Sequence, residues 1–223
     1  MSYRTGPKIV TDGLVLCLDA ADRNSYPGTG STWGDLSGNN NDFTINGPNF
    51  TNINNGCFNF QSGNSDYMRK TTSGIITDEI TIDVWFYISA QKSYHGILGS
   101  NVSLRYEIIT KLSTQFECSL TGNNWVQYDN QVPIQTWLNF TVSASNGIQW
   151  KTYKYANDLG NPTNSNGNWS INGSVSYIDI GRIRNQTLFS LDGIISNIKI
   201  YNRALSANEV RQNFEATKGR FGL

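Results

Sequence analysis

The chain has 223 residues, of which 38% are hydrophobic and 15% are charged, and its 17 basic residues balance 17 acidic ones. Nucleic-acid-binding proteins usually carry a basic excess, because contacts to phosphate supply most of their affinity, so this balance argues against a nucleic-acid partner. Aromatic residues make up 12% of the chain, which is more burial capacity than a disordered protein has. The length suits one β-rich unit, and we expect a single domain over residues 1–223.

The N-terminal residues 1–7 lack the apolar stretch of a secretory signal, and no apolar run approaches the roughly 20 residues of a membrane-spanning helix. We therefore expect a protein that is made in the cytosol and does not insert into a membrane. Cys17, Cys57 and Cys118 form an odd set without the spacing of a metal site. We expect them to be buried, free thiols of a protein that folds in a reducing compartment.

Short apolar runs and alternating apolar and polar residues follow one another along the chain, with turns rich in Asn and Gly between them. The clearest strand covers residues 80–88, whose even positions are all apolar and whose odd positions are polar or amphipathic. Other strands are expected at 14–19, 43–45, 57–60, 96–98, 104–110, 115–120, 125–128, 137–143, 148–155, 174–181 and 194–201. Short strands at this spacing are typical of a two-sheet sandwich or jelly roll.

Two later segments depart from the strand pattern. Residues 157–172 are rich in Asn, Gly and Ser and predict one long surface loop, the kind of segment that often carries a contact. Ser206 and Glu209 have the spacing of a capping box, in which each side chain bonds the other residue's backbone amide. Val210 and Phe214 follow four positions apart, so we expect one short C-terminal helix packed on a sheet.

Several motifs occur in a recognisable order: Asp-Gly-Leu-Val-Leu-Cys-Leu-Asp-Ala at 12–20, residues 25–30 running into Trp-Gly-Asp-Leu-Ser-Gly-Asn at 33–39, the strand at 80–87, and residues 192–206 leading into Glu-Val at 209–210. Together with residues 213–214 and 219–222, they resemble the concanavalin A-like, laminin G-like jelly-roll family, in the version common in bacteriophage and other viral structural proteins. The resemblance implies an all-β, two-sheet antiparallel jelly-roll sandwich. Fold alone does not dictate function.

The same family includes glucanases, which need two carboxylates facing each other across the bond to be cleaved. The Glu-x-Asp-x-x-Glu strand of its glucanase members does not occur in this chain. Glu79 and Asp83 share a strand face, but a solvated outer face explains that spacing as well. His95 is the only histidine and has no Gly-x-Ser-x-Gly motif beside it. We therefore expect no enzymatic activity, and a glucanase-like glycoside hydrolase is a distant alternative.

Many relatives of this fold hold a structural calcium ion, so the resemblance implies oxygen ligands for one. The candidate ligands in the family-like segments are Asp19, Asp35, Asn39 and Asp192. Where many relatives carry an acidic pair before the last strand, this chain has Ser196 and Asn197, which weakens such a site. Turn formation by Asp19 and Asp35 is the alternative. We expect no cofactor, with calcium as the one candidate.

Lectin sites stack a sugar on an exposed aromatic ring and hold its hydroxyl groups with neighbouring amides or carboxylates. The best match lies on a strand that leaves a turn, where Trp125 and Gln127 point to the same side. The full set of candidate carbohydrate-binding residues is Asn123, Asn124, Trp125, Gln127, Trp33 and Trp169. For each tryptophan, the alternative is a position at the edge of the core.

Two functions from different classes remain. The first is a non-enzymatic structural protein of a bacteriophage virion, used in capsid decoration, neck, tail or fibre, with other virion proteins and copies of itself as partners. The second is a glycan-binding adhesin that recognises host-surface polysaccharide. Aromatic residues gathered with amides in one groove favour the adhesin, and buried aromatic residues favour the structural protein.

Overall fold

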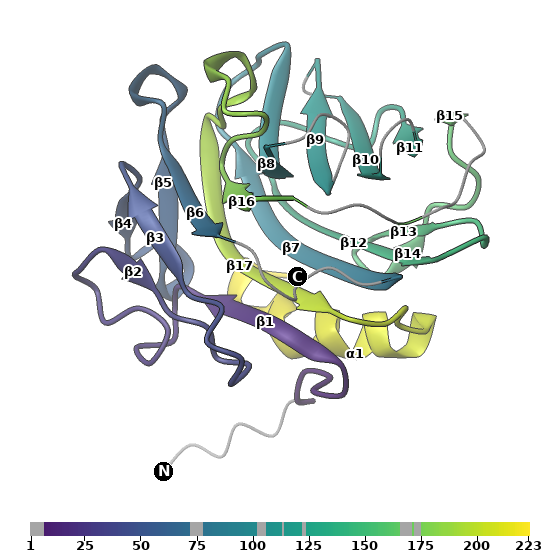
Figure 1. Ribbon diagram of the computed structural model, residues 1–223, viewed down its shortest axis with the longest axis horizontal. Coiled ribbons are helices and arrows are strands. Elements are labelled where there is room, and N and C mark those ends of the chain that lie inside the picture. The colour runs from purple at the N-terminus through teal and green to yellow at the C-terminus, as the bar shows by residue number, and fades with distance from the viewer. Residues whose placement is uncertain are drawn as a thin grey trace.

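The computed structural model describes residues 7–71, 78–101, 106–112, 114–121, 124–165, 171 and 175–223. Within these residues the chain forms two antiparallel sheets that pack face to face, and helix α1 (Ala207–Thr217) lies outside one of them (Figure 1). This arrangement confirms the predicted two-sheet sandwich with one short C-terminal helix. None of the described helices is long and apolar enough to span a membrane.

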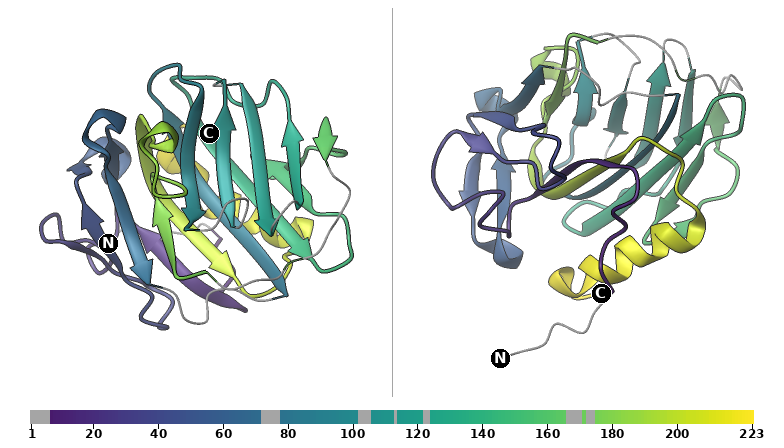
Figure 2. Two further views of the ribbon diagram at one scale, coloured as in Figure 1. Left: turned by 45° about the horizontal axis from the view of Figure 1, so that its top comes forward. Right: turned by 60° about the horizontal axis from the view of Figure 1, so that its bottom comes forward.

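The eight-stranded sheet has the order β14 (Asn157–Asp158), β13 (Lys151–Lys154), β12 (Trp137–Ser145), β7 (Glu79–Ile88), β17 (Gly193–Tyr201), β5 (Cys57–Phe60) and β4 (Asn49–Thr51), and β1 (Leu14–Asp19) also pairs with β17. The nine-stranded sheet has the order β15 (Asn164–Ser165), β11 (Asn124–Tyr128), β10 (Gln115–Thr121), β9 (Glu107–Lys111), β8 (Tyr94–Ser100), β16 (Tyr177–Ile180), β6 (Tyr67–Thr71), β3 (Phe43–Asn46) and β2 (Thr32–Trp33). The described 3₁₀ helices are η1 (Ile53–Asn55), η2 (Ser62–Asn64), η3 (Thr187–Phe189) and η4 (Lys218–Phe221). The left view of Figure 2 shows strands β8 to β11 side by side in front of the eight-stranded sheet.

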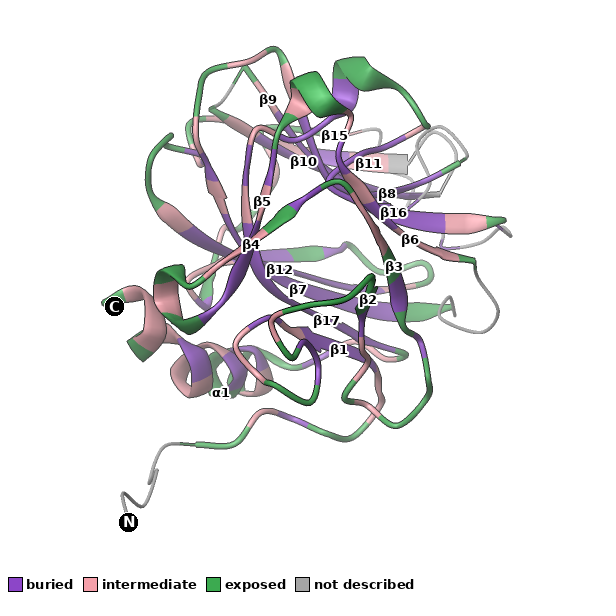
Figure 3. Cartoon of the chain, turned by 90° about the vertical axis from the view of Figure 1, so that its left-hand side faces the viewer, coloured by how far each residue is buried: buried purple, intermediate pink, exposed green. Residues whose placement is uncertain are grey.

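Alternate side chains of both sheets meet in the core between them. The even positions of β7 point inward, as predicted, and meet Phe116, Cys118 and Leu120 of β10 from the facing sheet. Figure 3 shows buried residues along β7, β12 and β17, whereas many of the surrounding loops are exposed. Cys17, Cys57 and Cys118 are buried and free, as predicted.

Some strand boundaries differ from the predicted ones. The segment predicted as one loop over 157–172 contains, in its described part, the two-residue strands β14 and β15. The strand predicted at 148–155 is shorter, because Ile148 is 65% exposed and only residues 151–154 pair with β12. Strand β6 is not predicted at all, because its sequence Tyr-Met-Arg-Lys-Thr carries two charges and a single aliphatic residue.

The outer face of the eight-stranded sheet is covered rather than solvated. Trp85 of β7 stacks on Phe221 of η4, with 3.9 Å between ring centroids, and its indole nitrogen donates to the hydroxyl of Thr217 at 3.0 Å. The capping box of Ser206 and Glu209 that starts α1 is present as predicted. The solvated outer face that was the alternative explanation for the spacing of Glu79 and Asp83 is therefore not present at Asp83, because α1 and η4 pack on this face.

This covered face buries a charged pair. Asp83 of β7 is 1% exposed and lies opposite Lys199 of β17 and Thr141 of β12 in the sheet register. Its carboxylate accepts hydrogen bonds from Lys199 Nζ at 3.1 Å, Asn139 Nδ2 at 2.6 Å and Thr141 Oγ1 at 3.2 Å. A buried charge needs such partners. Asp83 is thus enclosed in the structure and does not face a cleft together with Glu79.

His95 of β8 is fully buried, and its Nδ1 accepts a hydrogen bond from the amide of Asp192 at 3.3 Å. Burial, together with the nearby ammonium group of Lys92, lowers the pKa of His95 from 6.5 to about 4. The imidazole is therefore neutral in the folded protein at neutral pH. In the unfolded chain it takes up a proton below its ordinary pKa of about 6.5.

Because the pKa of His95 is lower in the folded protein than in the unfolded chain, we expect the free energy of unfolding to fall in acid through this residue. Between pH 6.5 and about 4 the unfolded state binds the extra proton, so stability falls as the pH falls. We expect a loss of roughly 2 kcal/mol on going from about pH 7.5 to about pH 5, measured by urea unfolding. Because the chain has one histidine, His95→Gln should flatten this part of the pH profile. An unchanged slope in His95→Gln would contradict the assignment.

Candidate functional site

The outer face of the nine-stranded sheet carries a cluster of polar and aromatic side chains on three adjacent strands. In the sheet register, Thr44 of β3 lies opposite Arg69 of β6, and Arg69 lies opposite Asp179 of β16. Side chains of directly opposed residues share one face of a sheet. Tyr67 and Tyr177 lie two positions from Arg69 and Asp179 along their strands, so they point to the same face.

Two arginines alternate with the two tyrosines on this face. The guanidinium carbon of Arg69 lies 3.5 Å from the ring centroid of Tyr177 and 5.0 Å from that of Tyr67. Arg182, which follows β16, lies 3.6 Å from the ring centroid of Tyr67. Cations over aromatic rings at these distances are attracted by the π-electrons, and the stack restricts the side chains. We call the four residues and Asp179 the Arg69 cluster.

One carboxylate holds both guanidinium groups. Asp179 is fully buried and accepts from Arg69 Nε at 2.7 Å and Nη2 at 2.8 Å, a bidentate pair. Arg182 donates to the same carboxylate from Nε at 3.3 Å and Nη2 at 3.1 Å. The hydrogen bonds to Asp179 raise the pKa of Arg69 above its usual value, so this guanidinium is always charged.

Arg182 reaches the cluster because the segment 181–192 crosses the outer face of the sheet over β8. The close approach needs glycine in β8: a Cβ at Gly99 would lie 2.1 Å from Ile183 Cγ2, and one at Gly96 would lie 2.5 Å from the carbonyl oxygen of Phe189. Beyond this crossing, Arg184 pairs with the buried Glu107 of β9 at 2.7 and 2.8 Å. The segment therefore divides the outer face into two areas.

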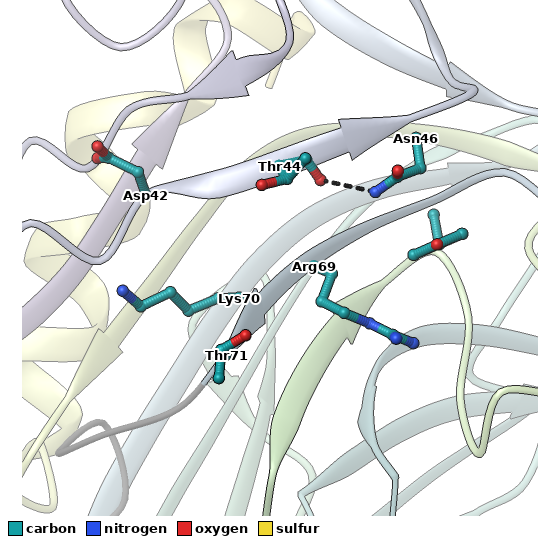
Figure 4. Close-up of a pocket in the computed structure, with 7 residues that line it drawn as sticks. Asp42, Thr44, Asn46, Arg69, Lys70 and Thr71 are labelled. Carbon is teal, nitrogen blue, oxygen red and sulfur yellow. Dashed lines mark hydrogen bonds between the residues drawn. The ribbon is translucent and has the colours of Figure 1, made fainter.

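The Arg69 cluster borders a pocket of about 440 Å³ at the β3 and β6 end of the sheet. Its lining residues are Asp42, Thr44, Asn46, Tyr67, Arg69, Lys70 and Thr71. Figure 4 shows Thr44 and Asn46 on β3 and Arg69 extending from β6 toward β16, with the amide of Asn46 bonded to the carbonyl oxygen of Thr44 at 3.2 Å. Hydroxyl, amide, guanidinium and phenol groups thus line one pocket, where they offer hydrogen-bond donors and acceptors to a polar ligand.

Two of the predicted carbohydrate-binding residues lie on the other area of the same face. Trp125 and Gln127 of β11 are half-buried and lie opposite Ser119 and Glu117 of β10. Gln127 donates from Nε2 to the carboxylate of Asp129 at 3.0 Å. The segment 181–192 lies between this area and the Arg69 cluster, so the two areas do not form one groove.

The other predicted residues are not at the Arg69 pocket. Trp33 is fully buried, with its ring centroid 4.9 Å from that of Phe58, so its ring cannot stack on a sugar. This corrects the prediction of Trp33 as a sugar-binding residue in favour of the alternative, a position in the core. Asn123, Trp169 and the side chain of Asn124 lie outside the described residues. Tyr67 and Arg69 are not predicted from the sequence, because β6 has no clear strand pattern and because Arg69 pairs with Asp179, which lies 110 positions away in the chain.

The four predicted calcium ligands are already bonded to other groups. Asp35 accepts from the amides of Cys17 at 2.8 Å and Ser37 at 2.9 Å, which is the turn-forming role given above as the alternative. Asp192 accepts from the amide and hydroxyl of Ser62 at 2.7 and 2.6 Å, and Asn39 donates from Nδ2 to the carbonyl oxygen of Leu14. No group of three or more His, Cys, Asp or Glu side chains in the described part of the chain is placed to hold a metal ion.

Asp19, one of the candidate calcium ligands, binds a cationic side chain. Both of its carboxylate oxygens accept from Nη1 of Arg220, at 2.7 and 2.9 Å. Nη2 of Arg220 donates to the carbonyl oxygen of Gly56 and to the hydroxyl of Ser196. At Ser196 the edge of β17 changes partner from β5 to β1. The guanidinium thus bridges β1, β17 and the residue that precedes β5 at a break in the sheet, and the predicted ligand set does not fit calcium.

The contacts of Arg220 predict that its replacement destabilises the protein and that calcium does not stabilise it. Arg220→Met should lower the free energy of unfolding by about 2 kcal/mol, because it removes charge-assisted bonds from a largely buried position. Arg23→Met is the matched control. Arg23 is exposed, and together with Arg220 it lines a surface pocket of about 290 Å³. Calcium or a chelator should leave the melting temperature of the unaltered protein unchanged. A clear rise in melting temperature with calcium would contradict this prediction.

Comparison with known families and structures gives a consistent picture of the fold. Residues 62–211 match the family model described as the concanavalin A-like lectin/glucanases superfamily. No similar sequence is found among curated proteins.

Several solved structures share the fold at low sequence identity. Trypanosoma rangeli sialidase matches with a TM-score of 0.66 and 16% identity over 93% of this chain and 33% of its own. The binding domain of botulinum neurotoxin DC in complex with SialylT has a TM-score of 0.68 and 15% identity, covering 93% of this chain and 52% of its own. The binding domain of Paraclostridial Mosquitocidal Protein 1 has a TM-score of 0.69 and 15% identity, covering 92% and 52%. This chain therefore spans a third to a half of each of these proteins, and the similarity concerns the fold.

Proposed function

Because the chain belongs to the concanavalin A-like lectin/glucanase superfamily, we propose that it is a non-enzymatic carbohydrate-binding domain whose site is the pocket beside the Arg69 cluster. The observation that carries the proposal is the convergence of Thr44, Asn46, Arg69 and Thr71 on one pocket. Sugars present many hydroxyl groups, and these side chains supply both donors and acceptors for them.

The chemistry of the pocket suits a sugar better than an apolar ligand. Tyr67 is half-buried and offers an amphipathic ring edge, while the side chains on β3 and β6 are hydroxyl, amide or charged groups. The stacking and ion pairing of Arg69 fix its guanidinium before a ligand arrives, which lowers the entropy lost on binding. Two of the similar structures are binding domains of toxins, one of them in complex with SialylT, which supports a binding role for this fold.

The place of action that we propose is a bacteriophage particle, on which the domain contacts other virion proteins and presents its site to host-surface polysaccharide. The support is the resemblance of residues 12–20, 192–206 and 219–222 to viral structural proteins, and the three cysteines that are buried as free thiols. Antibodies raised against the domain should bind intact particles purified from a lysate of the producing host. Antibody binding to free protein alone would count against a virion location.

Trp125 and Gln127 are proposed as a secondary contact for a long glycan, because they lie on the same sheet face beyond the segment 181–192. A short oligosaccharide in the Arg69 pocket would not reach them. Trp125→Ala should accordingly leave the affinity for short glycans unchanged, whereas a bulky side chain placed in the pocket should lower it.

A bulky side chain in the pocket tests the site without removing a buried contact. Thr44 is exposed on β3, so Thr44→Trp should fill the pocket and lower glycan affinity at least about tenfold, measured on a glycan array and then by calorimetry with the best ligand. Thr136→Trp is the matched control, since Thr136 is an exposed threonine before β12 of the other sheet. Equal affinity in Thr44→Trp and the unaltered protein would move the site elsewhere, and no binding to any glycan would reject the proposed function.

A further inference from the structure

The Arg69 cluster carries more positive than negative charge. Arg69 and Arg182 are both cations, and in the described structure Asp179 is the one carboxylate with which either of them forms an ion pair. Every Asp and Glu of the chain lies in the described segments, so no acidic side chain remains outside them to balance the second arginine. Two guanidinium groups and one carboxylate leave a net charge of about plus one.

Other buried carboxylates on the sheet faces are balanced more evenly. Within the part of the chain that the structure describes, Asp83 forms an ion pair with Lys199 and Glu117 forms one with Lys111, and neither carboxylate has a second cationic partner there. The excess at Asp179 is therefore a local feature and does not follow from a basic chain, because the whole protein has a formal net charge of zero.

The excess charge is poorly solvated. Arg182 is 7% exposed, and its guanidinium carbon is 3.6 Å from the ring centroid of Tyr67. A charge in such surroundings has lost much of its hydration, so an anion brought close to it gains more than it would at an open surface. The Arg69 cluster is thus preorganised to bind a negatively charged group.

The pocket gives such a negative group a point of contact. Arg69 uses Nε and Nη2 for Asp179, and its Nη1 has no hydrogen-bond partner among the described residues. Arg69 lines the pocket and has 28% of its side chain exposed. Lys70 lines the same pocket and adds a second cation, and Asp42 supplies one exposed carboxylate.

We infer that the sugar bound in this pocket is acidic and that its carboxylate or sulfate group contacts the guanidinium of Arg69. The inference rests on the proposed carbohydrate-binding function and names the ligand class of the same site. Arg182 acts through Asp179 as a positioning residue. It neutralises part of the negative charge of Asp179 and so leaves the positive charge of Arg69 available to the sugar. Thr44, Asn46 and Thr71 lie where they can bond the hydroxyl groups of the same sugar.

The experiment compares acidic glycans with their neutral parents. An array would carry glycans with carboxylated sugars, glycans with sulfated sugars, and the same chains after removal of the acidic group. The unaltered protein should bind at least one of the two acidic classes, and about tenfold more weakly or not at all when the acidic group is removed. This comparison needs no variant, so it holds whatever a substitution does to folding.

Arg182→Met then tests the source of the selectivity. Asp179 keeps its bidentate bond to Arg69 in this variant, so the fold should persist, but the cluster becomes neutral. Affinity for the acidic glycan should fall about tenfold. Arg211→Met is the matched control, because Arg211 is an exposed arginine on α1 and its loss changes the total charge by the same amount. Equal loss in both variants would mean unspecific charge attraction and would overturn the inference.

The outcomes separate the inference from the function on which it rests. Binding of neutral glycans that Thr44→Trp abolishes and Arg182→Met leaves unchanged would overturn the acidic ligand and leave the carbohydrate site in place. Absence of binding to every glycan, acidic or neutral, would overturn both. Preference for an acidic class that disappears in Arg182→Met would support both.

Discussion

Charged side chains are buried on the outer faces of both sheets, and the need to give each of them a partner shapes this molecule. On the eight-stranded sheet, Asp83 bonds to Lys199 on the neighbouring strand and is enclosed by the helix that follows. On the nine-stranded sheet, Asp179 and Glu107 take their arginine partners partly from a segment outside the sheet. An outer face that would be solvated in a simple sandwich is therefore an organised polar layer.

The partners come largely from the C-terminal part of the chain. The segment 181–192 brings Arg182 and Arg184 to strands that precede it, and η4 brings Arg220 to Asp19 near the other chain end. Arg220 bonds at the place where β17 changes its neighbour from β5 to β1. A guanidinium there joins strands much as a bound cation would, because it offers several directed donors to one carboxylate and to nearby oxygens.

The same requirement explains the charge of the area that we propose as the binding site. Among the described residues, Asp83 and Glu117 each pair with one cation, but Asp179 holds two arginines, and the stacked tyrosines keep both in place. This cluster borders a pocket lined by hydroxyl and amide groups. Fixed positive charge beside neutral polar groups is what an acidic sugar requires, and the fold supplies it on a sheet rather than on a loop.

Features that depend on a local pattern can be predicted from the amino-acid sequence. Period-two alternation at 80–88, the capping box at Ser206 and the absence of paired or metal-spaced cysteines predict the β-sandwich, the C-terminal helix and the free thiols, because strand period, helix caps and thiol spacing can be read over a few residues. The covering of Asp83, the burial of Trp33 and the pairing of Arg69 with Asp179 become visible in the three-dimensional fold. Alternation shows which residues of one strand share a face, but the neighbouring strand and the segment that crosses the face come from distant parts of the chain.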